Sequence, residues 1–226
     1  HLSRAETLTE WLDPSVVDEA DPDRRDGDVD IYSDACPHKP PFTDAFVQRF
    51  RERQLARNRR ITGWVRDTLD FLARRHDAEI ERAFVTHRTM CDVRWIDPRI
   101  DPNGRKPNWC YLGDPRTVNV GPVGLARFST LRSWLSQWSY DDSNATGAKN
   151  AADVRLVPVL QIENMADDAV PATHNPIIRD ALATTDKEYV RIVGATHYYL
   201  GQPEQLRACI ASLVDWSERK GFLRAG

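Results

Sequence analysis

The chain has 226 residues, a length that favours one domain or one domain with a small accessory layer. Hydrophobic residues make up 41% of it and charged residues 29%, which is ordinary for a globular protein. The formal net charge of -3 gives no reason to expect nucleic acid or an anionic membrane surface as a partner. No apolar run approaches the about 18 residues that a membrane helix needs, so no membrane span is predicted.

The four cysteines are Cys36, Cys91, Cys110 and Cys209, and they are scattered along the chain. None belongs to a CxxC pair, and no histidine stands at zinc-finger spacing. This pattern favours free thiols in a reducing, cytoplasmic compartment, with two disulfide bridges as the open alternative.

The chain begins His1-Leu2-Ser3-Arg4, without Met and without the basic and apolar regions of a signal peptide. We therefore expect His1 to be a cut end. Residues 4–12 are predicted to form a short helix. Residues 18–41, acidic and then proline-rich, are predicted to form a loop. Thr43 is predicted to cap a long helix that runs to about residue 75.

A second helical stretch is expected over residues 78–87. The proline and glycine content of residues 92–122 predicts a long loop with many turns. Apolar residues at helical spacing predict a third helix over 123–139, and residues 141–150 have the composition of a polar linker. Arg57, Arg59 and Arg60 of the long helix are expected to be solvated, to pair with nearby acids, or to bind an anion.

After residue 150, apolar runs alternate with helical patterns, which is typical of a parallel sheet with crossover helices. Strands are predicted at 157–162 and 189–193. A helix is predicted from residue 173 or 174 to about 183, and another over 205–219. Pro203 suits the first turn of that last helix.

A polar side chain follows each predicted strand. Asp167 comes in the turn after the first strand, and His197 follows the second strand after Gly194, which permits a tight turn. One strand–helix–strand unit separates them, so we expect both at the same rim of the sheet, where catalytic groups of open α/β sheets collect.

Residues 150–220 resemble the last two strands of the α/β-hydrolase superfamily. The resemblance rests on Val159-Leu160-Gln161-Ile162, Asp167, Val170-Pro171 and Gly194-Ala195-Thr196-His197, which occur in the superfamily's order of acid and then base. Asn164 stands where the family usually has glycine. Because asparagine tolerates a left-handed conformation, the turn is expected to survive.

The resemblance implies that His197 is the general base and acid and that Asp167 orients its ring. It also implies a reaction that needs neither a metal nor an organic cofactor. The family's spacing to Pro171 selects Asp167 over its neighbour Asp168. Without the resemblance, an aspartate after a strand is more often a turn or cap residue, and a histidine in a loop is more often solvated.

The family's nucleophile stands on a G-x-S-x-G elbow, and no such elbow occurs in this sequence. The serines expected on the third helix have no glycines beside them: Ser129, Ser133, Ser136 and Ser139. Cys110 follows Trp109 in a loop, and Cys209 is expected to be core. We therefore expect the nucleophile on a preceding N-terminal segment or a companion chain.

On this interpretation, residues 1–150 are a mainly helical cap and residues 151–226 are the C-terminal segment of an α/β-hydrolase core. A cap shapes the pocket below it, so Trp109, Trp134 and Trp138 become candidate substrate-binding residues; for each one, burial in the core of the cap is the alternative.

The predicted function is that of a serine hydrolase that cleaves a carboxylic ester or related acyl bond of a small molecule. One alternative is a non-catalytic binding protein on a degenerate hydrolase scaffold. Another is a serine or cysteine of this chain that acts with His197. Two strands would leave an edge and apolar surface uncovered, so we expect the chain not to be stable alone.

Overall fold

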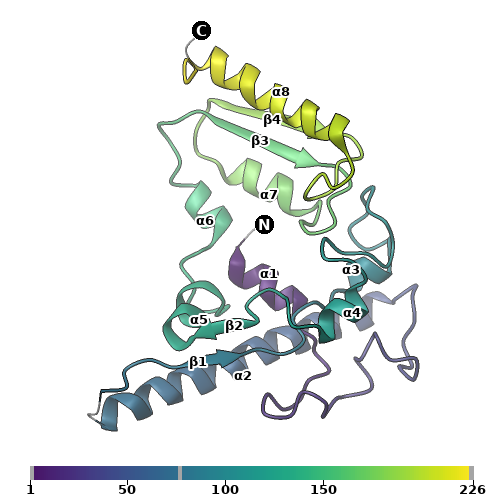
Figure 1. Cartoon of the computed structure of the whole chain (residues 1–226), viewed down its shortest axis with the longest axis vertical. Coiled ribbons are helices and arrows are strands. Elements are labelled where there is room, and N and C mark those ends of the chain that lie inside the picture. Colours follow the sequence, from purple (N-terminus) through teal and green to yellow (C-terminus); the bar gives the residue numbers. More distant parts are fainter. Residues whose placement is uncertain (1–2, 76–77, 224–226) are drawn as a thin grey trace. The chain divides into compact units, whose positions relative to one another are not determined.

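A computed structural model describes residues 3–75 and 78–223, which contain α-helices and small β-sheets (Figure 1). Each sheet has two strands, so the described residues form a mixed α/β structure. No helix among them is both long and apolar enough to cross a membrane. The expected cut end at His1 lies outside the described residues.

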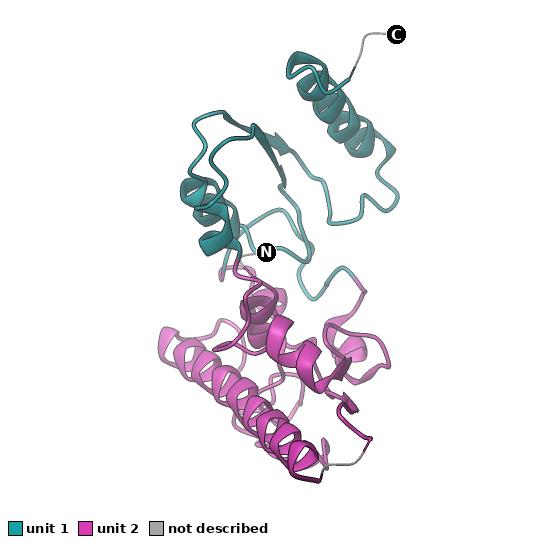
Figure 2. Cartoon of the chain, turned by 90° about the vertical axis from the view of Figure 1, so that its left-hand side faces the viewer, with its two compact units in different colours: residues 1–2, 101–111, 147–226 teal, residues 3–100, 112–146 magenta. Residues whose placement is uncertain are grey.

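The described chain divides into two compact units (Figure 2). We call residues 3–100 and 112–146 the N-terminal unit, and residues 101–111 and 147–223 the C-terminal unit. The expected division was between residues 150 and 151, with everything before it in a cap. In the structure, the segment 101–111 belongs instead with the C-terminal strands.

Two helices of the N-terminal unit lie where the sequence predicts them. They are α1 (Arg4–Trp11) and α2 (Asp44–Arg75). Ser3 caps α1, because its Oγ accepts a hydrogen bond of 2.9 Å from the backbone N–H of Glu6. Thr43 acts in the same way on α2.

Two of the helices predicted from the sequence are wrong, because part of each segment forms a strand. Residues 78–87 contain the short strand β1 (Ala83–Val85), and residues 123–139 contain β2 (Phe128–Thr130) before α5 (Leu131–Gln137). The two strands pair antiparallel. Thr130 then starts α5 with a capping box, so the helix cannot extend back to residue 123.

Short helices also interrupt two segments that were predicted as irregular. The predicted loop 92–122 contains α3 (Val93–Ile96) and α4 (Pro115–Val120). The predicted linker 141–150 runs into α6 (Gly147–Ala151). Aspartates cap α3 and α4, so both begin at turn residues of the kind that suggested a loop.

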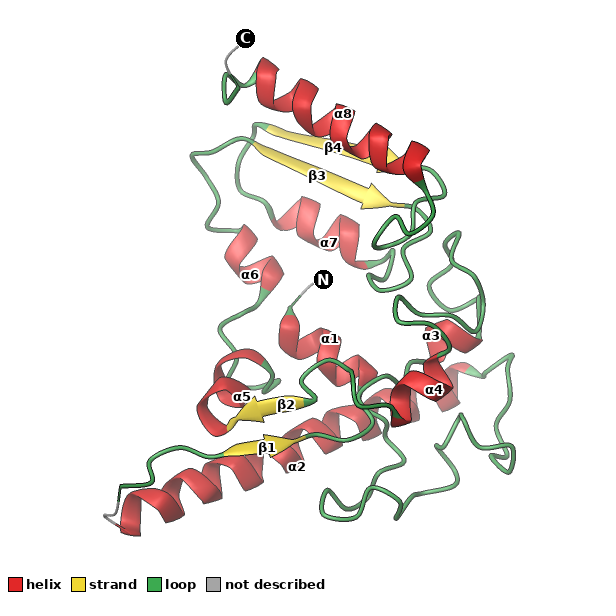
Figure 3. Cartoon of the chain, viewed as in Figure 1, coloured by secondary structure: helices red, strands yellow, loops and turns green. Residues whose placement is uncertain are grey.

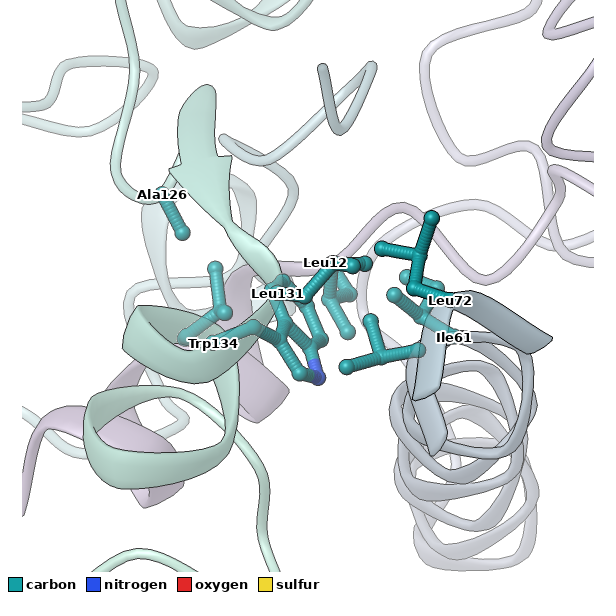
Figure 4. Close-up of a cluster of buried hydrophobic side chains, with 8 residues drawn as sticks. Leu12, Ile61, Leu72, Ala126, Leu131 and Trp134 are labelled. Atoms are coloured by element: carbon teal, nitrogen blue, oxygen red, sulfur yellow. The ribbon is translucent and has the colours of Figure 1, made fainter. Parts of the chain in front are cut away.

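One hydrophobic cluster joins α1, α2 and α5 in the N-terminal unit (Figure 4). Its buried members are Leu8, Leu12, Ile61, Val65, Leu72, Ala126, Leu131 and Trp134. A second cluster packs the loop around Val29 and Ile31 against Phe42, Phe46 and Phe50. These clusters hold the long helix against segments that are distant in sequence.

The polar face of α2 is partly buried as well. Arg57 is 1% exposed, and its guanidinium donates to both carboxylate oxygens of Glu19 and to three backbone carbonyls. Arg60 also pairs with Glu19, and Arg59 pairs with Asp141. The expected pairing of these arginines with acids is confirmed, whereas the complete burial of Arg57 was not predicted.

The C-terminal unit contains a parallel pair of strands with a helix on each face (Figures 1 and 3). The strands are β3 (Val159–Asn164) and β4 (Lys187–Ile192), and the helices are α7 (His174–Ala181) and α8 (Pro203–Arg219). The predicted order of strand, helix, strand, helix is confirmed, and each bound agrees within a few residues.

Helix α8 has an apolar stripe that the described residues leave exposed. Leu206, Ile210 and Leu213 follow one another at helical spacing and are 42%, 51% and 48% exposed. None of the residues of α8 is buried. A helix packed within a complete core would bury such a stripe.

Candidate acid–base site

The register of the parallel strands brings two turns together. Asn164, the last residue of β3, stands opposite Ile192, the last residue of β4. Beyond the strands, the backbone N–H of Met165 donates to Ile192 O at 3.0 Å and that of Ala166 to Ala195 O at 2.9 Å. Gly194 turns the chain with a φ of +71°, a conformation that L side chains rarely adopt.

Asp167 and His197 meet at these two turns. The Nδ1 atom of His197 lies 3.2 Å from each carboxylate oxygen of Asp167. Asp167 Oδ1 also accepts hydrogen bonds from the backbone N–H groups of Ala169 and Val170, at 2.8 and 2.7 Å. The carboxylate is therefore fixed by its own turn and available to the imidazole.

The environment favours the protonated form of His197. The hydrogen bond to Asp167 raises the pKa of His197, and its half-buried position offsets only part of that effect. Asp168 adds a smaller contribution through its charge. A carboxylate that holds the Nδ1 proton leaves Nε2 as the nitrogen that exchanges protons with a substrate.

Asp168 has a different position from Asp167. Its Oδ1 accepts a hydrogen bond of 3.2 Å from the backbone N–H of His197, so it holds the loop rather than the ring. Burial raises the pKa of Asp168. Of the two candidate acids, Asp167 is the one that contacts the imidazole.

The segment 101–111 supports the acid turn, a role that the sequence analysis missed. The Asn103 amide donates to Asp167 O at 2.9 Å, and the backbone N–H of Gly104 donates to Met165 O at 2.9 Å. A Cβ at Gly104 would lie 3.3 Å from Ala166 Cβ, so this approach favours glycine. The turn-forming run Asp101-Pro102-Asn103-Gly104 was the available signal.

Asp101 connects this segment to the chain after the acid turn. Its carboxylate accepts hydrogen bonds from the backbone N–H groups of Ala172 and Thr173, at 3.0 and 2.8 Å, and it pairs with Arg105 at 3.0 Å. Burial opposes ionisation, but the hydrogen bonds from Thr173 and the other partners outweigh it and lower the pKa of Asp101.

Asn164 stabilises the site through its side chain and not through a left-handed turn. It is the last residue of β3, and it is absent from the described residues with positive φ. Its amide donates to Thr196 O at 3.0 Å and its Oδ1 accepts from the Tyr199 hydroxyl at 2.6 Å. The turn is kept as expected, but without a left-handed conformation at Asn164, whose side chain instead connects the two turns.

A cavity of about 280 Å³ opens beside the pair. Its lining residues are Ile162, Asn164, Asp167, Val170, Asn175, His197, Tyr199 and Cys209. Cys209 was expected to be core, but it is half-buried and lines this cavity. The rings of Tyr111 and Tyr198 contact the imidazole edge-on, with centroids 5.7 and 4.7 Å away.

The three candidate tryptophans lie in different places. Trp109 belongs to the C-terminal unit, is 39% exposed, and stacks under the ammonium group of Lys106. Trp134 and Trp138 belong to the N-terminal unit. Trp134 is 0% exposed, and its indole N–H donates to Thr62 Oγ1 at 3.0 Å, so it offers no surface to a ligand here. Substrate binding by these residues stays a prediction.

The four serines considered as nucleophiles belong to the N-terminal unit. Ser129 lies in β2, and Ser139 follows the end of α5, so neither is on the helix where it was expected. Ser133 is part of the capping box of α5, and the hydroxyl of Ser139 contacts Thr62 and Asp142. Among the described residues, no group of three or more His, Cys, Asp or Glu side chains could hold a metal ion.

Comparisons of the chain with protein-family models, with curated proteins and with solved structures gave no match. The resemblance to α/β-hydrolases stays a prediction from the motifs of residues 150–220.

Proposed function

We propose that Asp167 and His197 are the acid and base of a serine hydrolase of the α/β-hydrolase type, which cleaves a carboxylic ester or related acyl bond. The observation that carries this proposal is the imidazole–carboxylate contact of 3.2 Å between turns at the carboxyl ends of adjacent parallel strands. Open α/β sheets place catalytic groups at this rim.

In the proposed reaction, His197 Nε2 takes the proton of a serine hydroxyl as the serine oxygen attacks the substrate carbonyl carbon. The tetrahedral intermediate collapses when the imidazolium returns that proton to the leaving alcohol oxygen, which breaks the ester bond. Water then attacks the acyl-enzyme with His197 again as base. Asp167 stabilises the imidazolium in both steps.

We infer that the serine comes from another polypeptide segment, either of the same protein or of a companion chain. Three features support this. Of the four candidate serines, Ser129 lies in a strand, and the hydroxyls of the other three are hydrogen-bonded within the N-terminal unit. The apolar stripe of α8 is exposed. Among the described residues, β3 pairs only with β4, so its outer edge can accept a further strand.

Cys209 provides a second candidate, because it lines the same cavity as His197. A thiolate formed with the help of His197 would attack the same carbonyl and give a thioester intermediate. This alternative predicts activity from the present chain alone, and Cys209→Ala would abolish that activity.

The test is ester hydrolysis by the native protein, purified without a denaturing step, compared with His197→Gln, Cys209→Ala and the control His38→Gln. We expect His197→Gln to lower kcat/KM by about 10³-fold, within the range of general acid–base contributions. The two other variants should retain activity. Equal activity of His197→Gln and wild type would disprove the proposal, and the absence of hydrolysis in every form would favour the non-catalytic alternative.

A further inference from the structure

A second small cavity lies in the N-terminal unit and has a volume of about 190 Å³. Its lining residues are Pro22, Asp23, His87, Arg88, Asn119, Val120 and Arg127. Three of these side chains are basic or can become so, and one is acidic. The cavity is smaller than the about 300 Å³ at which pockets for drug-sized ligands begin.

Arg127 is a half-buried guanidinium without an acidic partner among the described residues. Its Nη1 donates to Gly121 O, its Nη2 lies 3.4 Å from Asn119 O, and its Nε is buried without a hydrogen-bond partner. Burial lowers the pKa of Arg127, and the charges of Arg57 and Arg88 lower it further. A buried charge is costly unless an opposite charge compensates it.

The backbone beside the cavity has an unusual conformation. Arg88 and Ala126, which precedes Arg127, have φ values of 53° and 52°. Such left-handed residues other than glycine are uncommon and collect at ligand sites. At Gly124, a Cβ would lie 2.7 Å from Arg127 Nη2, so a larger residue there would displace the guanidinium from its present position.

The acid that lines the cavity is already engaged at its rim. Asp23 is exposed, and its Oδ1 accepts a hydrogen bond of 2.9 Å from Arg88 Nη2. Arg88 Nε donates to Pro22 O at 3.1 Å. One exposed carboxylate and two guanidinium groups line the cavity, which gives its lining an excess of positive charge.

We propose that this cavity binds a small oxyanion, a phosphate or a carboxylate group, with Arg127 as its main countercharge and Arg88 as its second donor. Guanidinium groups bind such oxyanions through paired hydrogen bonds. His87 lines the same cavity and can donate through a ring N–H. The site is independent of the acid–base pair, because all its residues belong to the N-terminal unit.

The experiment is a calorimetric titration of the full chain with inorganic phosphate at constant ionic strength, set with chloride. Wild type should bind one phosphate saturably. Arg127→Gln should weaken binding at least about tenfold, because the variant loses the countercharge and its charge-assisted hydrogen bonds to the anion. The control Arg132→Gln removes an exposed arginine that pairs with Glu81 and should bind as wild type does.

Asp23→Asn tests the same site and leaves the Arg127 guanidinium unchanged. Removing the competing carboxylate should tighten phosphate binding, opposite to the effect of Arg127→Gln. Titrations with acetate and glycerol phosphate distinguish a carboxylate from a phosphomonoester. The absence of saturable phosphate binding would overturn the proposal, as would equal binding by Arg127→Gln or weaker binding by Asp23→Asn.

Discussion

Asp167 and Asp168 are neighbours in the sequence but hold different parts of His197. Asp167 contacts the imidazole through Nδ1, whereas Asp168 accepts the backbone N–H. The resemblance to α/β-hydrolases favoured Asp167 over Asp168 from the sequence alone. The supporting contact of Asp168 could not be predicted, because it depends on how the two turns meet in three dimensions.

The two aspartates should therefore affect the titration of His197 unequally. Asp167→Asn removes the hydrogen-bonded charge that raises the pKa of His197, so that pKa should fall clearly. Asp168→Asn should lower it less. NMR titration of the His197 ring protons measures both effects, with Asp180→Asn, which changes an exposed helical aspartate, as the control. A larger effect of Asp168→Asn would contradict this account.

The complete burial of Trp134 favours a role in the core over a role in substrate binding. Its ring packs in the cluster of α1, α2 and α5 and is 0% exposed. Trp134→Ala should lower the free energy of unfolding by about 3–5 kcal/mol, as for other large core side chains. Trp109→Ala, at a partly exposed ring, should cost less than about 1 kcal/mol. Urea denaturation compares the two variants, and equal costs would show that Trp134 is not core.

At the scale of elements, Asp97 joins the end of α3 to the segment before α2. Its Oδ2 accepts the backbone N–H of Phe42 at 2.8 Å, and Arg99 pairs with the same carboxylate. The hydrogen bond from Arg99, together with that from Phe42, lowers the pKa of Asp97 to about 2. The carboxylate is therefore more acidic in the folded than in the unfolded chain.

A carboxylate whose pKa is lower in the folded than in the unfolded chain stabilises the folded protein at pH values above its unfolded-state pKa. This stabilisation is lost as the pH falls through the folded-state pKa. Asp97→Asn should thus be less stable than wild type by about 1–2 kcal/mol at pH 7. The difference should shrink as pH falls from about 4 towards about 2. Urea denaturation across this range tests it, with the exposed Asp34→Asn as control. A difference independent of pH would contradict the assignment.

The sequence predicts elements well where one pattern dominates. The long apolar periodicity of α2 and the strand–helix–strand order after residue 150 were both recognisable. Strands β1 and β2 have three residues each, and they exist because they pair with each other. Sequence spacing cannot reveal that pairing, so both were predicted as helix.

The contacts of segment 101–111 at the candidate site could not be predicted from sequence either. Its prolines and glycine correctly indicated turns, but they do not say which part of the chain the turns contact. Hydrogen bonds from Asn103 and Gly104 to the acid turn bridge more than sixty residues of sequence. The Asp167–His197 pair was predictable because parallel register brings equivalent strand ends together, whereas this support was not.

At the scale of the whole molecule, the exposed apolar stripe of α8 predicts association. Ile210 and Leu213 are about half exposed, and the proposed partner segment would cover them. Replacing both with lysine should reduce self-association of the purified chain, as measured by analytical ultracentrifugation. The matched control replaces Ala211, also on α8, with lysine. A monomeric wild-type chain that unfolds cooperatively would contradict the need for a partner.

The central claim, that Asp167 and His197 serve a serine on another segment, is tested most directly by labelling with a fluorophosphonate. The natively purified protein is reacted, denatured and examined by intact mass. We predict a labelled serine on a polypeptide segment outside these 226 residues. Labelling should be lost in His197→Gln and kept in His38→Gln. Labelling that persists without His197, or no labelled serine in any segment, would contradict the account.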